Sequence, residues 1–172
     1  LFPYTTLFRS GITVCNAPGY STDSVAEHVF AMLLHMSRKL IECKAQTAEG
    51  KWIDEPLIGQ ELAGKTIGIV GFGAIGRATV RIAQGFNMKV IAHTRSPEKY
   101  KEDHPDVEFK SVDEIMAESD VVSLHIPANA ETEHLISKER LEMMKPGAVL
   151  VNCARGKVVD EEALAEICES GT

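Results

Sequence analysis

A glycine-rich segment between a strand and a helix most constrains what this chain folds into. Residues Gly71–Gly76 read GFGAIG; the apolar run Thr66–Val70 precedes them, and a helical pattern follows as far as Asn87. In a G-x-G-x-x-G pattern the glycines allow a tight turn, a close approach of the backbone to a pyrophosphate, and close packing of helix against strand. The motif alone is weak, but its place between a buried strand and an amphipathic helix indicates a dinucleotide site.

Strands and helices alternate through most of the chain. Short connections between them are typical of a parallel sheet with right-handed crossovers, so we expect an α/β, doubly wound fold. The predicted strands are 12–15, 66–70, 89–92, 107–109, 121–125 and 148–151, and the predicted helices are 24–43, 74–87, 111–118, 137–144 and 160–169.

The first predicted helix differs from the others. Apolar residues recur in it at helical spacing from Val25 to Leu40 and occupy nearly every face, which is typical of a helix between two layers or at a subunit interface. Because residues 11–45 interrupt the alternation, we expect them to belong to a second domain. Residues 46–172 are then the NAD(P)-binding domain.

Both ends of the chain suggest a truncated reading frame. Residues 1–10, LFPYTTLFRS, correspond in back-translation to the tail of a common sequencing adapter, so we interpret them as an artefact rather than a native strand. At the other end, Gly171 stands where a helix would be capped and a further strand would begin. We expect the nucleotide-binding domain to be cut before its last strand.

Composition excludes several classes of function. The chain has a net charge of −7 and no basic run, so neither nucleic acid nor an anionic membrane is an expected partner. The most apolar stretch, 29–36, is far shorter than the ~20 residues of a membrane span. No C-x-x-C spacing suggests a zinc site or a disulfide framework, so we expect no metal and a cytoplasmic protein with reduced thiols. The cysteines are Cys15, Cys43, Cys153 and Cys168.

Two groups of residues are expected to hold the phosphates. The amides of Ala74 and Ile75 open the helix after the glycines, where unpaired N–H groups and the helix dipole favour an anion. About 20 residues after the motif, a carboxylate would bind the ribose 2′-hydroxyl, but the sequence there is Thr94, Arg95 and Ser96. A guanidinium and two hydroxyls suit a 2′-phosphate, so we predict NADP(H) preference over NAD(H). The alternative is a solvated Arg95 and the use of both cofactors.

Several separate motifs, in order, resemble the D-isomer-specific 2-hydroxyacid dehydrogenases. Besides GFGAIG they are NAPGYST at 16–22, AEH at 26–28, HIP at 125–127, ETEHLI at 131–136, MKPG at 144–147, VNCARG at 151–156 and VDE at 159–161. The resemblance covers almost all of residues 11–172, and it implies that residues 11–45 are the remnant of the substrate domain with an interdomain or dimer helix. Within the family, PGYST looks most like glycerate dehydrogenases that reduce hydroxypyruvate or glyoxylate.

The resemblance implies roles for residues after two later strands. It implies that Arg155 is catalytic: it would bind the substrate carboxylate and polarise the carbonyl that accepts hydride. A planar guanidinium at the end of a strand suits that role, although an ion pair with a nearby acid is the alternative. The resemblance also places Cys153 and Ala154 near the nicotinamide, and Ile126, Pro127 and Thr132 near the adenosine.

The resemblance implies a Glu and a His proton donor beyond Gly171, and none of the six histidines fits that position. We therefore expect the fragment to bind cofactor without catalysing reduction. A corepressor-like, dinucleotide-sensing protein is an alternative of another class, and a phosphoglycerate or formate dehydrogenase is one within the family. In relatives, the long apolar helix helps to form a homodimer, so a homodimer is also expected.

Overall fold

The computed structural model describes residues 15, 17–52 and 57–170, and it contains one five-stranded parallel sheet. The strand order β3-β2-β1-β4-β5 reverses direction at β1, as expected for a doubly wound sheet. The prediction of an α/β fold with a parallel sheet is thus confirmed. The adapter-like residues 1–10, most of the predicted strand 12–15, and Gly171 lie outside the described residues. The strands are β1 (Thr66–Val70), β2 (Lys89–His93), β3 (Glu108–Phe109), β4 (Val121–Leu124) and β5 (Val149–Asn152).

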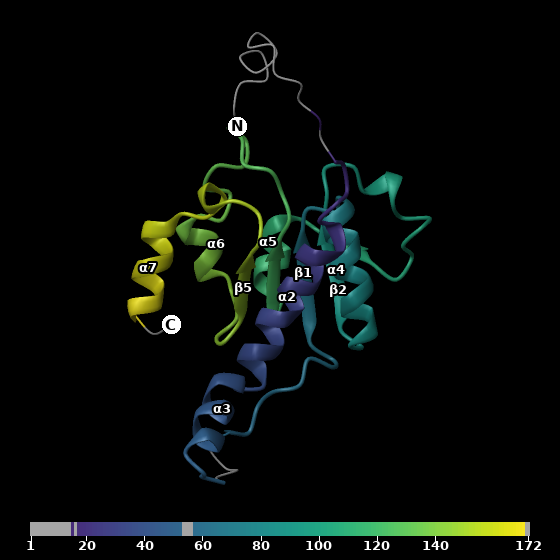
Figure 1. Cartoon of the computed structure of the whole chain (residues 1–172). Helices are drawn as coiled ribbons and strands as arrows, with labels where there is room; N and C mark the ends of the chain where they lie inside the picture. Colours follow the sequence, from purple (N-terminus) through teal and green to yellow (C-terminus); the bar gives the residue numbers. More distant parts are fainter. Residues whose placement is uncertain (1–14, 16, 53–56, 171–172) are drawn as a thin grey trace.

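Helices cover both faces of this sheet (Figure 1). Successive strand side chains point to opposite faces, so Ile67 and Ile69 pack with α2 and α4 while Val70 packs with α5, α6 and α7. Both faces are apolar, which explains why the buried residues of β1 and β4 are hydrophobic apart from Gly68 and Ser123. The helices are α2 (Thr22–Ser37), α3 (Leu40–Ala48), α4 (Ala74–Gly85), α5 (Val112–Glu118), α6 (Lys138–Glu142) and α7 (Glu161–Ser170), with 3-10 turns η2 (Pro97–Lys99) and η3 (Gly156–Val158).

Helix α5 shows how the sequence sets an element boundary. Ser111 accepts a hydrogen bond from the Glu114 backbone N–H, and the Glu114 side chain accepts one from the Ser111 N–H. These reciprocal bonds satisfy two N–H groups that the first turn would leave unpaired. The S-x-x-E spacing therefore fixes where α5 begins.

The prediction of one continuous helix over 24–43 is wrong. Helix α2 ends at Ser37, Lys39 has a left-handed backbone with φ 49°, and α3 begins at Leu40. A left-handed residue interrupts the regular backbone hydrogen bonds of a helix, while the apolar spacing continues across it. Periodicity therefore did not reveal the break.

Some apolar residues of α2 are buried against the sheet and others are exposed to solvent. Ala26, Val29, Phe30 and Leu33 are buried, and the Phe30 ring stacks on Phe86 with centroids 5.2 Å apart. One face of α2 thus packs on the sheet and the opposite face is exposed, so the prediction that this helix lies between two layers or at a subunit interface stays a prediction.

Helix α2 packs into the same core as the sheet, and no second domain is seen among the described residues. The assignment of residues 11–45 to a substrate domain stays a prediction. Within the described part of the chain, every helix is too short or too polar to cross a membrane.

Candidate functional site

The carboxyl ends of four neighbouring strands meet at one edge of the sheet. Val70 of β1 is in register with His93 of β2 and Leu124 of β4, and Leu124 is in register with Asn152 of β5. All strands run in the same direction, so the loops that follow them lie together, at the upper end of the sheet in Figure 1. Every predicted site residue lies in these loops or at the start of α4. We call this region the carboxyl edge.

The glycines of the first loop each meet a different constraint. Gly71 has φ +105°, and a Cβ there would lie 2.6 Å from the His125 carbonyl oxygen. A Cβ on Gly76 would collide with the Gly71 carbonyl oxygen and crowd Ile69. At Gly73, by contrast, a Cβ would meet nothing within 4 Å. Gly71 and Gly76 are therefore needed by the fold itself, whereas Gly73 borders open space.

The amino end of α4 faces that space without an acidic group. Gly73 is its N-cap and provides no side-chain cap, and the first turn contains no acidic residue. Ala74 and Ile75 occupy this turn, as predicted. An uncapped amino end beside open space fits the pyrophosphate of a dinucleotide.

Phe72 holds the glycine loop against the body of the protein. Its ring is 2% exposed and makes edge contacts with Tyr100 and Phe109 at centroid distances of 5.1 and 5.0 Å. Arg77 donates to the Phe72 carbonyl oxygen at 3.2 Å and lies 5.4 Å from the centre of the Tyr100 ring. Sequence reasoning missed this support, because the motif leaves position 72 unspecified and the aromatic rings that contact Phe72 are more than 25 residues away.

His125 connects β4 to α4 beneath the loop. Its Nε2 lies 2.9 Å from Ser123 Oγ and 3.2 Å from Thr79 Oγ1, and Thr79 Oγ1 donates to the Ile75 carbonyl oxygen at 3.0 Å. Burial lowers the pKa of His125 to about 4. The ring is therefore neutral near pH 7 and serves as a hydrogen-bonding link rather than a proton donor.

The loop after β2 contains an unforeseen ion pair. Thr94 and Ser96 are partly buried and Arg95 is exposed, and the Ser96 N–H donates to Thr94 Oγ1 at 3.4 Å. Arg95 Nη1 lies 3.1 Å from Glu131 Oε2. The position at the end of β2 is not acidic, as the sequence shows, but Arg95 nevertheless has a carboxylate beside it. The acid comes from the loop after β4, which local sequence around Arg95 does not reveal.

The loop after β4 is fixed by its own hydrogen bonds. Thr132 Oγ1 donates to the Pro127 carbonyl oxygen at 2.6 Å and accepts from the Asn129 N–H at 2.9 Å. Ile126 is partly buried, and its side chain is 2.7 Å from the position that a Cβ on Gly71 would occupy. Ile126, Pro127 and Thr132 thus stand at the carboxyl edge, where Thr132 braces the loop.

The loop after β5 is organised by Asn152. Its side chain donates to the Arg155 carbonyl oxygen at 2.9 Å and accepts from the Ala154 N–H at 3.0 Å. Arg155 is exposed and its guanidinium donates to the Ala154 carbonyl oxygen at 2.8 Å. Among residues 15, 17–52 and 57–170 no carboxylate pairs with Arg155, so the alternative of an ion pair is not seen. Burial raises the pKa of the Cys153 thiol, which argues against a nucleophilic role.

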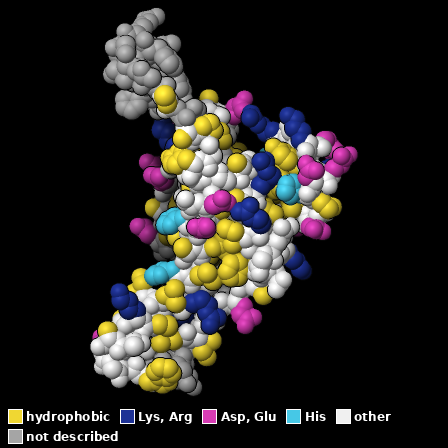
Figure 2. Space-filling view, turned by 45° about the vertical axis from the view of Figure 1, so that its right-hand side comes forward, with side chains coloured by type: hydrophobic (Ala, Val, Ile, Leu, Met, Phe, Trp, Pro, Cys, Tyr) yellow, Lys and Arg dark blue, Asp and Glu magenta, His cyan; other side chains and the backbone are white. Residues whose placement is uncertain are grey.

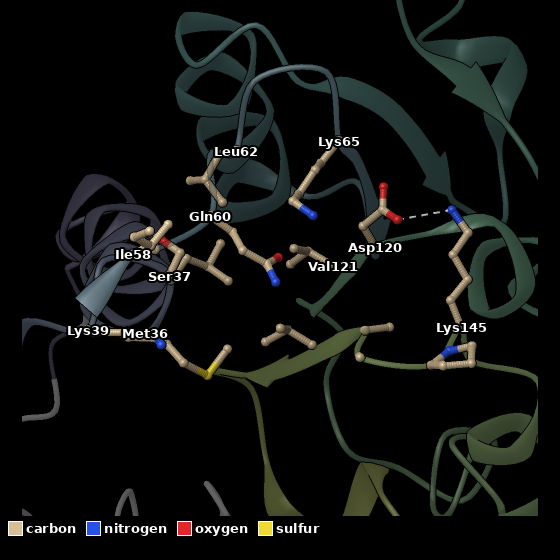
Figure 3. A pocket seen from close by; sticks show the side chains of 16 residues that line it. Met36, Ser37, Lys39, Ile58, Gln60, Leu62, Lys65, Asp120, Val121 and Lys145 are labelled. Carbon is tan, nitrogen blue, oxygen red and sulfur yellow. Dashed lines mark hydrogen bonds and ion pairs between the residues drawn. The ribbon is translucent and has the colours of Figure 1, made fainter. Parts of the chain in front are cut away.

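A cavity of about 520 Å³ lies at the opposite, amino edge of the sheet (Figure 3). Met36, Lys65, Asp120 and Lys145 help to line it, and none of the predicted site residues does. Asp120 accepts from the Thr66 N–H at 2.7 Å and pairs with Lys145 at 3.1 Å. Burial opposes its ionisation, but the Thr66 hydrogen bond and Lys145 outweigh burial and lower its pKa. This carboxylate connects strands and is not part of the carboxyl edge.

Comparison with known proteins agrees with this geometry. Residues 30–172 match the NAD binding domain of the D-isomer specific 2-hydroxyacid dehydrogenases. The glyoxylate reductase of Pyrococcus furiosus is 42% identical over 95% of this chain and 51% of its own length, and the hydroxypyruvate reductase of Thermotoga maritima is 44% identical over 95% and 52%. The chain therefore spans about half the length of these curated relatives.

A solved structure of an acyclic imino acid reductase, in complex with NADPH and D-Arg, aligns with a TM-score of 0.83 and 39% identity over 97% of this chain and 53% of its own. D-lactate dehydrogenase from Escherichia coli aligns with a TM-score of 0.88 and 32% identity over 97% of this chain and 52% of its own.

Proposed function

The chain belongs to the D-isomer-specific 2-hydroxyacid dehydrogenase family, and from this membership we propose that it is the nucleotide-binding part of a reductase of small 2-keto acids. Glyoxylate and hydroxypyruvate are the proposed substrates, because those reductases are among its relatives at above 40% identity. The observation that carries the proposal is the carboxyl edge, where the open side of Gly73 and the exposed Arg155 follow parallel strands of one sheet.

The proposed cofactor site runs along the glycine loop and the loops after β2 and β4. The pyrophosphate would lie beside Gly73 at the amino end of α4, and Arg95 would reach a 2′-phosphate, so we propose NADP(H) as the preferred cofactor. Ile126 and Pro127 would border the adenosine, and Cys153 and Ala154 the nicotinamide. When bound, the dinucleotide supplies the hydride.

Arg155 is the proposed catalytic residue of this chain. The Asn152 side chain holds the Arg155 backbone carbonyl. The Arg155 guanidinium donates to the Ala154 carbonyl oxygen and has no carboxylate partner among the described residues, so it would pair with the substrate carboxylate. It would also stabilise the negative charge that develops on the carbonyl oxygen during reduction. His125 cannot provide the proton near pH 7, because its pKa of about 4 keeps it neutral.

Titration of this chain with NADPH and NADH, followed by nicotinamide fluorescence, tests the cofactor proposal. Saturable binding that is tighter for NADPH than for NADH, without turnover of glyoxylate or hydroxypyruvate, is the expected result. Equal or tighter binding of NADH would overturn the preference, and absence of binding to both would overturn the cofactor site. The substrate proposal is tested on a longer reading frame that contains this sequence, where Arg155→Gln should abolish keto-acid reduction. The corepressor-like alternative would instead be supported if the unsubstituted protein had no reductase activity and Arg155→Gln bound a partner protein as strongly as the unsubstituted protein does.

The exposed face of α2 and α3 is proposed to contact a second copy of the chain. Met36, Leu40 and Ile41 are 53, 48 and 62% exposed, and Figure 2 shows apolar side chains exposed along the projecting arm that includes α3. A cluster of this kind is typical of a protein interface. Sedimentation should show a dimer that Ile41→Lys weakens. Glu42→Lys should leave it intact, because consecutive residues of an α-helix lie about 100° apart around its axis.

A further inference from the structure

The ion pair between Arg95 and Glu131 connects two loops of the proposed cofactor site. Arg95 follows β2 and Glu131 follows β4, and their side chains are 83% and 75% exposed. Because Arg95 Nη1 and Glu131 Oε2 are 3.1 Å apart, any group that Arg95 binds lies within a few ångströms of the Glu131 carboxylate. The two residues therefore act on the same part of a bound ligand.

Glu131 belongs to a loop whose backbone is fixed. Its N–H donates to Asn129 Oδ1 at 2.9 Å, and the Thr132 N–H donates to the same oxygen at 3.1 Å. Thr132 in turn donates to the Pro127 carbonyl oxygen at 2.6 Å. These bonds anchor the backbone that carries the carboxylate, while the Arg95 guanidinium is at the end of a long, exposed side chain.

We infer that Glu131 is a specificity-determining residue that limits the preference for NADP(H), an inference that rests on the proposed cofactor site. Its carboxylate competes with a 2′-phosphate for Arg95 and repels that phosphate. Towards NAD(H), the same carboxylate can accept a hydrogen bond from the ribose 2′-hydroxyl, as an acid at the end of β2 does in other dinucleotide folds. Arg95 and Glu131 thus act in opposite directions on cofactor choice.

The expected effect is modest because both side chains are exposed. An exposed charge pair is weak, so removal of the carboxylate should raise affinity for a 2′-phosphate by about two- to five-fold. The same removal should leave affinity for a nucleotide with a free 2′-hydroxyl unchanged or lower.

The test measures equilibrium binding to the 172-residue chain by calorimetry, with adenosine 2′,5′-bisphosphate and 5′-AMP as probes. These probes differ at the 2′ position and do not need the nicotinamide side of the site. Glu131→Gln should raise the ratio of bisphosphate to AMP affinity, and Arg95→Gln should lower it. Glu133→Gln is the matched control, since Glu133 lies in the same loop but pairs with Lys157 at 3.3 Å.

The outcomes separate this inference from the proposed function. If the chain binds the probes but Glu131→Gln changes the ratio no more than Glu133→Gln does, the role of Glu131 is refuted while the cofactor site stands. If the chain binds neither probe and neither dinucleotide, the cofactor site and this inference both fail. Thermal unfolding of each variant checks that the fold is kept.

Discussion

The two edges of the sheet differ in how they use polar side chains. At the amino edge, Asp120 is engaged by the Thr66 N–H and Lys145, so its charge connects strands. At the carboxyl edge, Arg155 is exposed and contacts a neighbouring carbonyl oxygen, while Gly73 leaves open space. Polar side chains therefore stabilise the fold at the amino edge, whereas at the carboxyl edge they remain accessible to a ligand. Substitutions at the two edges should affect different measurements.

Substitution of Gly73 should have the largest effect on binding. Gly73→Val places a branched side chain in the space proposed for the pyrophosphate, and overlap of this kind should weaken dinucleotide binding about 10- to 100-fold. Stability should hardly change, because the backbone has φ −75° and a Cβ meets no atom within 4 Å. Fluorescence titration and urea unfolding measure the two quantities.

Gly85→Val is the matched control, since a Cβ at Gly85 also meets nothing within 4 Å and it lies at the far end of α4. Equal binding by the two variants would contradict the assignment of function to the carboxyl edge.

Substitution of Asp120 should show the opposite pattern. Asp120→Ala removes the acceptor of the Thr66 N–H and the partner of Lys145, which should lower the free energy of unfolding by about 1–3 kcal/mol. Nucleotide affinity should stay the same, because Asp120 is at the amino edge. The exposed Asp106 provides a control, Asp106→Ala, with little expected change. If Asp120→Ala lost as much nucleotide affinity as Gly73→Val does, the two edges would not have the separate roles proposed for them.

Acid should weaken the carboxyl edge through His125. Its folded pKa of about 4 lies below the ordinary value of 6.5, so the unfolded chain gains a proton on passing below pH 6.5 while the folded chain stays neutral. The stability that depends on a neutral His125 is therefore fully present above pH 6.5 and is lost as the pH falls towards 4. The free energy of unfolding should be lower by about 1–2 kcal/mol at pH 5 than at pH 7. Urea unfolding at pH 7 and pH 5 measures this loss.

The variant His125→Gln should be less stable at pH 7 yet lose less stability between pH 7 and 5. The pKa of Asp120 at the amino edge is lowered instead, so Asp120 remains ionised in this range and contributes little to the difference. An unchanged pH dependence in His125→Gln would show that another group causes the loss.

Substitution of Arg155 should have the smallest effect on stability. Arg155→Gln is expected to change the free energy of unfolding by no more than about 0.5 kcal/mol, because its side chain is exposed and pairs with no carboxylate in the described part of the chain. Thermal unfolding checks this. A loss comparable to that of Asp120→Ala would indicate a structural rather than a substrate-binding role.

Local patterns predicted the elements of the fold better than the contacts of the site. The alternating strands and helices depend on residues close in sequence, and most were predicted within a few positions. The S-x-x-E cap at Ser111 is equally local, although only the helix that it begins was predicted. The break at Lys39 was missed, because apolar spacing does not report backbone dihedral angles. The Asn152 turn spans only the four residues 152–155 and has a local signal, an Asn at the end of a strand, which can be recognised as a turn former.

The sequence by itself determined the parallel α/β fold and the edge at which the glycine loop and Arg155 are found, because the common direction of the strands follows from the helices that alternate with them. The strand order came from the structure. Only the tertiary structure decided which charges stand opposite one another. Arg95 meets Glu131 across 36 residues of chain, and Phe72 meets aromatic rings from beyond β2. Such pairings depend on where separate loops end after the sheet is assembled, which no local pattern specifies.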